Sequence, residues 1–428
     1  MNFVLEAEGD LAAALEAYSA KQLAPSKHAD MNKRHFVISR FVTEGQVNRK
    51  TPLQHFIDAE TTDDGDRALL QRWHHSFMGL FAIDSIDGET LHLTNWLTEK
   101  RYTVQLTSNT EAQQAARLKT SEILLAQLAP VSETEWLFLA PWVTLGKLGK
   151  PKLAVAIGSF KENYKPYLYG DAPDLLDAAW QSVEDYHQEF IEFFGGDVVS
   201  MSGEELSHKL SEFQQQTMQA KLQQAGLDGS KSLSDLAAEA GISSEELETA
   251  AQSMGANANV LNQAIAKTGT TGMALPQVEL PVHLKRAESV TVMSHPRWGV
   301  VFVPTFQLLS TLLSSETWQT SLEAQDLLRQ LIKDPDIKSF VVQQLAERYP
   351  TAVEALIQKI FQRPDFQVTT DLTALLEEYG KPVEPELPET ASVPLHLHNL
   401  FQEVVVNLEK GKQKSKSKKK AVVGFQRA

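Results

Sequence analysis

Histidines, carboxylates and lysines provide the reactive side chains of this chain, because it contains no cysteine. Disulfide bonds, thiolate metal sites and a cysteine nucleophile are therefore excluded. The sequence also lacks the HExxH, GxSxG and GxGxxG patterns of zinc hydrolases, serine hydrolases and dinucleotide-binding proteins. A catalytic site would have to be assembled from histidines and carboxylates that lie far apart in the sequence.

Two pairs of histidines are close enough in sequence to be considered as metal ligands. His74 and His75 are adjacent in a segment expected to be helical, where neighbouring side chains point about 100° apart. His396 and His398 would share a face only if their segment were extended. No nearby carboxylate or third imidazole accompanies them, and the surrounding leucines indicate packing. We therefore predict no metal site and no cofactor.

Carboxylates and a glycine-lysine loop give no clearer signal. Asp197, in the stretch GDVVS, has no second acid at a spacing that predicts general acid and base roles. The stretch TLGKLGKPK, with Gly146, Lys147, Gly149 and Lys150, departs from the Walker spacing, and no Ser or Thr follows the lysine. We interpret it as a loop with exposed lysines and predict no catalytic residue.

A string of lysines at the C-terminal end is the clearest asymmetric feature. Residues 410–428 hold eight of the 40 Lys and Arg side chains and no acid, so the rest carries 32 basic and 55 acidic side chains, a net charge of −23. Such an acidic body repels phosphate backbones, and we expect no DNA binding. The tail is a candidate tether for RNA, an anionic surface or an acidic protein, or only a solubilising terminus. Its candidate residues are Lys410, Lys412, Lys414, Lys416, Lys418, Lys419 and Lys420.

The segment from Leu233 to Ala251 has the spacing of a helix-turn-helix unit, with Gly241 at the turn. Its second helix carries Glu245, Glu246 and Glu248, which would be repelled by phosphates. We therefore interpret this segment as a helical hairpin that serves packing or contact with a partner.

The elements expected around these residues begin with helices over 1–76, one of them preceded by acids at Asp63, Asp64 and Asp66 that suit its cap and first turn. Five short alternating runs between Phe77 and Gly146 then predict strands, with a hairpin turn at 85–88. Five strands in about 70 residues predict a small antiparallel β barrel or a strongly curled sheet, of the kind found in SH3-like modules.

The second half is predicted to be mainly helical. An amphipathic helix covers 172–195 and ends at a glycine pair, and a capping box at Ser202 starts the next one. The run SVTVMSHPRWGVVFVP predicts two strands around a turn, and helices follow from 305 to 376. Trp298, beside Arg297, is a candidate exposed anchor, although we predict that it is buried. The fold class is therefore α+β, predominantly helical, with a β hairpin in a mainly helical C-terminal domain.

A chain of 428 residues is too long for one hydrophobic core. Composition and turn signals predict the following segments: a helical start at 1–76, a small β module at 77–150, a helical segment at 151–225 that completes the N-terminal domain, a helical insert and linker at 226–280, a mainly helical domain at 281–380, a Pro-rich connector and last helix at 381–409, and a disordered basic tail at 410–428.

The order of features in the first half is similar to that of uncharacterised bacterial proteins, including cyanobacterial ones. The similar stretches are WHHSFMGLFAIDSIDGETLHLTNWLTEKRYTVQL and HQEFIEFFGGDVV. The resemblance implies a helical segment that leads into a small β module and a Phe-Phe-Gly-Gly-Asp turn after the following helix. It implies no activity and no functional residue.

These observations predict a non-enzymatic protein-interaction or assembly factor. One alternative is an RNA-associated accessory factor that uses the β module and the basic tail. The other is an enzyme with an unrecognised carboxylate and histidine site. The N-terminus does not read as a signal peptide, and no apolar run reaches the roughly 18 residues of a membrane span, so we expect a soluble cytoplasmic protein.

Overall fold

The computed structural model describes residues 2–23, 31–60, 63–224, 273–274, 278–401 and 404. The chain forms two compact units, the first containing Met1–Leu176 and Glu403–Ala428 and the second containing Asp177–Gln402. The division falls inside helix α8, Pro173–Phe194. The helix-turn-helix candidate at 233–251 and the lysine tail at 410–428 lie outside the described residues.

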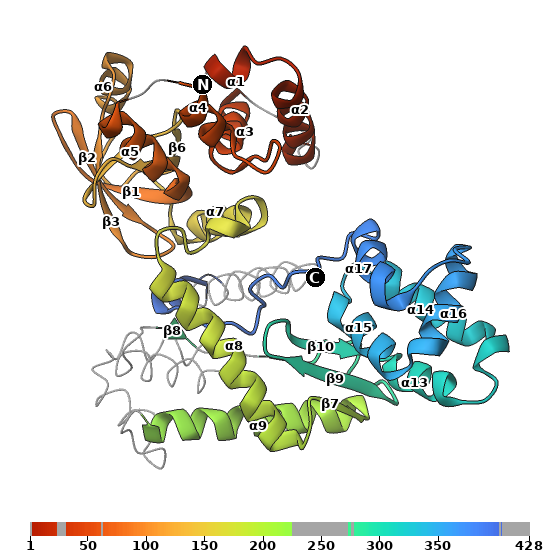
Figure 1. Cartoon of the computed structure of the whole chain (residues 1–428). Helices are drawn as coiled ribbons and strands as arrows, with labels where there is room; N and C mark the ends of the chain where they lie inside the picture. The colour runs from red at the N-terminus through yellow and green to blue at the C-terminus, as the bar shows by residue number, and fades with distance from the viewer. Residues whose placement is uncertain are drawn as a thin grey trace, which may run out of the picture. The chain divides into compact units, whose positions relative to one another are not determined.

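The first unit is built around a five-stranded barrel (Figure 1). The strands follow the order β1-β2-β3-β5-β4, and β1 pairs with β4 to close the ring. All pairs in the ring are antiparallel except β3 with β5, which is parallel. A short strand, β6, continues the pairing along β4. The bounds are β1 Phe77–Asp87, β2 Thr90–Asn95, β3 Arg101–Gln105, β4 Ile123–Pro130, β5 Glu135–Phe138 and β6 Val143–Gly146.

The arrangement of these strands is that of the OB-fold, a five-stranded Greek-key barrel. The features that identify it are the strand order, the parallel closure and helix α6, Asn109–Ala115, between β3 and β4. The small barrel predicted from the sequence is confirmed. The SH3-like architecture expected from the sequence contains neither α6 nor the parallel pair of β3 and β5. The pair was missed because local alternation does not specify how distant strands pair.

Strand β1 is longer than the sequence predicted. A bulge between Ile83 and Ser85 lets β1 stay paired with β2 as far as Asp87, so the expected turn at 85–88 is wrong. The turn lies at Gly88 and Glu89, and Gly88 has a φ of +64°, which a glycine adopts without a Cβ clash. The bulge divides β1 between its two partners, since residues 77–82 pair with β4 and residues 81–87 pair with β2.

Helices cover the outer surface of β1 and β4. Met78 and Leu80 alternate with the barrel-filling residues of β1, yet both are buried. Gln127, which faces outward from β4, is also fully buried, and its amide is satisfied at both ends. The hydroxyl of Ser39 donates to its Oε1 at 2.5 Å, and its Nε2 donates to the hydroxyl of Ser76 at 3.2 Å. This face of the barrel is therefore closed.

The covering helices precede the barrel in sequence. Helix α5 begins where the sequence predicted, because the side chain of Asp63 accepts the backbone N–H of Asp66 at 2.8 Å. Figure 1 shows α3 and α5 beside the barrel, and the short 3-10 turn η1 leads directly into β1. The bounds are α1 Asn2–Leu5, α2 Asp10–Leu23, α3 Met31–Glu44, α4 Pro52–Ala59, α5 Asp64–Arg72 and η1 Trp73–His75.

The loop at 168–172 packs against the end of the barrel where β1 begins. It follows α7, Lys150–Asn163, and the 3-10 turn η2, Lys165–Tyr167. A Cβ placed on Gly170 would lie 2.5 Å from Cδ2 of Phe77, so only a glycine fits at this distance. Tyr167 also packs on the barrel core. Close contact with the first residue of β1 therefore fixes the loop.

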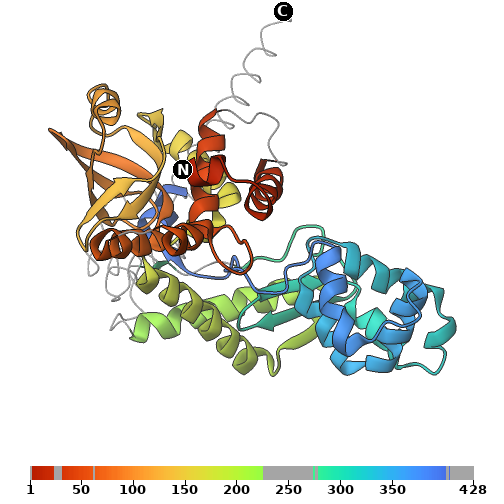
Figure 2. The ribbon, with the colours of Figure 1, turned by 45° about the horizontal axis from the view of Figure 1, so that its top comes forward.

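The second unit has a three-stranded sheet between two helical layers (Figure 2). The strands follow the order β10-β9-β7, and every pair is antiparallel. Val290 and Val292 of β9 pack with α8 and α9, whereas Met293 packs with the C-terminal helices. The predicted hairpin and the predicted helix over 172–195 are both confirmed. The bounds are β7 Val198–Met201, α9 Gly203–Gln224, β9 Val290–His295 and β10 Gly299–Val303.

The C-terminal region is helical from Phe306 to Glu378, close to the predicted range of 305–376, and is divided into five short helices. They are α13 Phe306–Ser314, α14 Leu322–Lys333, α15 Ser339–Arg348, α16 Pro350–Phe361 and α17 Val368–Glu378, with the 3-10 turn η3 Trp318–Thr320. Their apolar faces form one core with Trp298, which is 7% exposed, so its predicted burial is confirmed.

The proline-rich segment after α17 is held against the second unit. The buried amine of Lys381 donates to the carbonyls of Asp334 and Ile337 at 2.6 and 2.5 Å, at the end of α14. Further on, the backbone N–H of Ser392 donates to the hydroxyl of Ser182 at 2.8 Å. A two-residue strand, β11 Val393–Pro394, then pairs with β8, Met273–Ala274.

No helix within the described ranges is both long enough and apolar enough to cross a lipid bilayer.

The contact between Gly170 and Phe77 can be tested by substitution. Gly170→Ala should lower the free energy of unfolding by about 1–3 kcal/mol, because the added methyl group meets a packed ring. Gly158→Ala is the matched control, since no atom lies within 4 Å of that position in α7 and alanine favours a helix by about 0.5–1 kcal/mol. Urea unfolding of both variants checks that the free energy of unfolding falls in Gly170→Ala and rises in Gly158→Ala. An unchanged midpoint for Gly170→Ala would contradict the close packing of Gly170 on Phe77.

Candidate functional site

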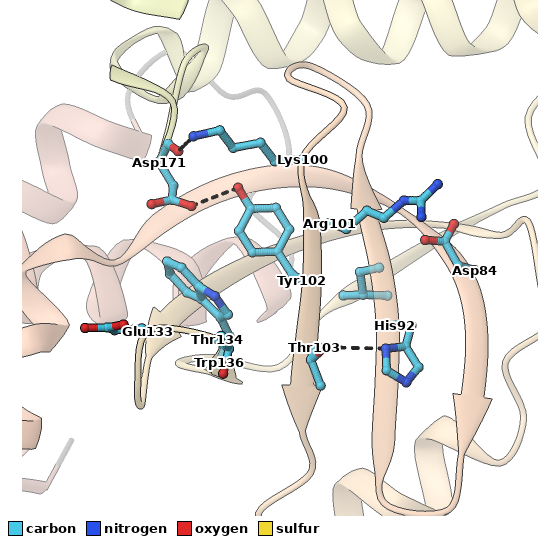
Figure 3. Close-up of a pocket in the computed structure, with 11 residues that line it drawn as sticks. Asp84, His92, Lys100, Arg101, Tyr102, Thr103, Glu133, Thr134, Trp136 and Asp171 are labelled. Atoms are coloured by element: carbon cyan, nitrogen blue, oxygen red, sulfur yellow. Dashed lines mark hydrogen bonds between the residues drawn. The ribbon is translucent and has the colours of Figure 1, made fainter. Parts of the chain in front are cut away.

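A cleft of about 660 Å³ lies on the barrel over β2, β3 and the loop between β4 and β5 (Figure 3). It belongs to the part of the barrel that the N-terminal helices leave uncovered. Its lining combines three basic and three acidic side chains with four uncharged polar or aromatic groups and one leucine. The lining residues are Asp84, His92, Leu93, Lys100, Arg101, Tyr102, Thr103, Glu133, Thr134, Trp136 and Asp171.

Strand alternation decides which side chains face the cleft. On β3, Arg101 and Thr103 point outward, and the intervening Tyr102 packs in the barrel core. On β2, His92 lies beside Thr103, and its Nδ1 is 3.4 Å from the threonine hydroxyl. In Figure 3, Arg101 extends toward Asp84 of β1. The cleft floor is therefore polar and carries both signs of charge.

Asp171, from the loop at 168–172, forms one wall of the cleft. Its carboxylate accepts a hydrogen bond from the hydroxyl of Tyr102 at 3.2 Å, and its carbonyl accepts one from the amine of Lys100 at 2.6 Å (Figure 3). Lys100 also pairs with Asp174 at 3.2 Å. Asp171 has a φ of +55°, in the left-handed region that costs a residue with a Cβ. Its contacts with β3 hold this unfavourable conformation in place.

An aromatic cluster lies beneath that wall. The ring of Tyr102 is 5.6 Å from Phe77 and 5.2 Å from Trp136, and the latter pair is edge to face. Burial, and then the charge of Asp171, raises the pKa of Tyr102 far above its ordinary value. Tyr102 therefore stays protonated and can donate to Asp171. Because Tyr102 and Trp136 are only 3% and 8% exposed, their ring faces serve the core and not a ligand.

An ion pair with a buried arginine and a half-buried glutamate supports the loop from the other side. Arg40 of α3 contacts Glu44 at 2.7 Å, and the hydroxyls of Tyr18 and Tyr167 both donate to Glu44. The guanidinium also lies over the Tyr167 ring, 5.3 Å from its centroid. Burial and the charge of Glu44 raise the pKa of Tyr167, so its hydroxyl remains a donor. This network fixes η2, which leads into the loop at 168–172.

His92 is placed between a hydroxyl and a carboxylate. Its Nδ1 lies 3.4 Å from Thr103 Oγ1, and its Nε2 lies 3.4 Å from the carboxylate of Asp87. Both distances exceed the 2.6–3.2 Å expected between a nucleophile, a base and its orienting acid. The side chains of His92 and Asp87 are 43% and 68% exposed, so water competes for both contacts. The arrangement identifies no catalytic residue, and the enzyme alternative stays a prediction.

The other candidates from the sequence do not meet at this site. His74 and His75 lie exposed on η1. His396 and His398 are in a helical stretch and not an extended one, so they do not share a face. Burial lowers the pKa of His398. Asp197 belongs to the second unit.

The lysines of the glycine-lysine loop also do not line the cleft. Lys147, Lys150 and Lys152 are exposed, the last two within α7. The seven tail lysines lie outside the described residues, so their role stays a prediction. Over the described part of the chain, no three His, Asp or Glu side chains are grouped as a metal ion would require.

The cleft itself was missed by the sequence analysis. Lys100, Arg101 and Asp171 carry no motif, and they meet only because the loop at 168–172 returns to β3. One local signal could have been used, since alternation places His92 and Thr103 each on the outward face of its strand, although their pairing is known only from the structure. Nothing in that pattern indicated a cleft.

The strained position of Asp171 gives a test of the cleft wall. Asp171→Ala should lower the free energy of unfolding by about 2 kcal/mol, because the hydrogen bond from Tyr102 is lost and because alanine tolerates a positive φ poorly. Asp171→Asn should cost less than about 1 kcal/mol, since asparagine accepts the same bond and adopts this φ more readily. Urea unfolding distinguishes the two variants. Equal losses of unfolding free energy would contradict the role given to Asp171 in the cleft wall.

Comparison of the chain with protein-family models, with curated proteins and with solved structures gives no match. The resemblance of the first half to uncharacterised bacterial proteins therefore stays a prediction.

Proposed function

We propose that this chain is a non-enzymatic interaction or assembly factor that binds a protein partner at the β2–β3 cleft of its barrel. The observation that carries the proposal is the unequal covering of the barrel surface. Gln127 and Met78 lie buried on the β1–β4 face, whereas Arg101 is exposed on the β2–β3 face. The open face is polar and holds a cleft of about 660 Å³. Concave sites with a few convergent polar groups are where ligands bind.

The charges in the cleft support a protein partner. Basic and acidic side chains both line it, so a ligand of one sign would meet repulsion from part of the lining. A peptide segment carries both signs and backbone hydrogen-bonding groups, and it can match such a surface. The basic and acidic lining residues are His92, Lys100, Arg101, Asp84, Glu133 and Asp171.

RNA is the second candidate ligand, and the barrel topology favours it. In the OB-fold, the face formed by the second and third strands and the adjoining loops binds oligonucleotides. Such sites combine positive charge with aromatic rings on which bases stack. Here Tyr102 and Trp136 are turned into the core, and Asp84 and Glu133 would repel phosphates. RNA binding therefore ranks below protein binding.

Photo-crosslinking in the cells that make the protein tests the proposal. A photoreactive amino acid at Thr134, in the cleft, should give protein adducts that survive nuclease treatment. The control position is Ala116, which is exposed at the end of α6 and outside the cleft. Arg101→Glu should reduce the adducts from Thr134 and leave those from Ala116 unchanged. Adducts no stronger at Thr134 than at Ala116 would contradict the proposal.

The RNA alternative makes a separate prediction. It requires binding to mixed RNA that falls steeply between about 50 and 200 mM salt, because phosphate contacts release counterions. Deletion of residues 410–428 should then abolish the binding. We expect instead that Arg101→Glu leaves any binding of the purified protein to RNA unchanged, as measured by a filter assay. Loss of RNA binding in this variant would reverse the ranking of the two ligands.

A further inference from the structure

The turn between β9 and β10 in the second unit is held by the imidazole of His295. Its Nδ1 accepts the backbone N–H groups of Arg297 and Trp298, at 3.0 and 3.2 Å. A ring nitrogen accepts a hydrogen bond only when it carries no proton. The observed turn therefore requires neutral His295, with its proton on Nε2.

This turn positions three groups that contact other elements of the unit. The guanidinium of Arg297 lies 4.0 Å from the ring centroid of Trp180 on α8. Trp298 stacks on Phe340 of α15, with 6.1 Å between the ring centroids. Gly299 has a φ of +71° and lies so close to the segment at 388–390 that a Cβ would be 2.5 Å from the Thr390 hydroxyl. Release of the turn would loosen all three contacts.

The charged groups around His295 come from several elements. From α8, His187 bonds to Ser294 through its Nδ1 at 3.1 Å, and Glu184 lies near His187. From the segment before β7, Asp197 lies near both histidines. The turn itself adds Arg297.

The remaining neighbours are uncharged or turned to solvent. From α15, Phe340 lies 5.0 Å from the His295 ring, and the amide of Gln344 contacts the carboxylate of Asp197 at 3.5 Å. Glu389, the charged residue of the segment at 388–390, is exposed.

Burial, and then the charge of His187, lowers the pKa of His295, whereas Asp197 opposes the shift. Burial likewise lowers the pKa of His187.

We propose that the β9–β10 turn is a pH-operated latch, in which a solvent proton added to Nδ1 of His295 displaces the N–H groups of Arg297 and Trp298. The two N–H donors would then face a third N–H and a positive charge, so the turn opens. Because the pKa of His295 lies below its ordinary value of 6.5, the latch is closed at neutral pH. Its contribution to stability is complete above pH 6.5 and is lost as the pH falls through the lowered pKa.

The matched variant is His295→Asn. An asparagine side chain accepts the backbone N–H two residues later and does not titrate, so it can hold the turn at any pH. In the full chain, the emission of Trp298 is obtained by subtracting the spectrum of Trp298→Phe, and it should shift to the red as the pH falls below 6.5. His295→Asn should lose this shift, whereas His283→Gln, at an exposed histidine of the same unit, should keep it. A shift that persists in His295→Asn would overturn the proposal.

A measurement on the unmodified protein covers the case in which His295→Asn fails to fold. The ring nitrogen signals of His295 in an NMR titration should show Nδ1 unprotonated at neutral pH and protonated with a midpoint below 6.5. The same midpoint should describe the Trp298 emission. Protonation of His295 without a change at Trp298, or a neutral-pH signal from protonated Nδ1, would overturn the latch.

Discussion

The unequal covering of the barrel is the constraint on which the account of the first unit depends. A small barrel has one interior, which its inward side chains fill, and an outer surface that must be covered by protein or exposed to water. Here the buried side chains of Met78, Leu80 and Gln127 show that helices cover the β1–β4 side, and the hydroxyls of Ser39 and Ser76 satisfy the buried Gln127 amide. The polar β2–β3 side is left to face water and carries the cleft.

The wall of the cleft is supported by interactions that would be costly in isolation. Asp171 occupies an unfavourable backbone region, and Arg40 and Glu44 form an ion pair in which the arginine is largely removed from water. The hydroxyl of Tyr102 stabilises Asp171, and the hydroxyls of Tyr18 and Tyr167 stabilise the ion pair. The loop at 168–172 lies between these two sets of contacts. Such over-determined positions are expected where a surface must keep one shape for recognition. This rigidity supports a binding role for the cleft.

Local patterns in the sequence predicted much of the fold but not the cleft. Alternation identified the strands, Asp63 marked the start of a helix, and the run around Trp298 indicated a buried hairpin, because these features depend on neighbouring residues. The OB-fold closure depends on β3 meeting β5, and the cleft depends on Asp171 reaching Tyr102, about 70 residues away in sequence. No local propensity encodes such contacts. The bulge in β1 was missed for the same reason, since register is set by the partner strand.

The most direct test of the central claim uses the absence of cysteine, which makes a single introduced thiol unambiguous. Thr103→Cys places that thiol in the cleft, and Ala116→Cys places it on the exposed end of α6. For each thiol, the rate of modification in intact cells is divided by the rate in the purified protein. If a protein partner occupies the cleft, this ratio is lower at position 103 than at position 116, which serves as the reference. Equal ratios at the two positions would show an unoccupied cleft and contradict the account.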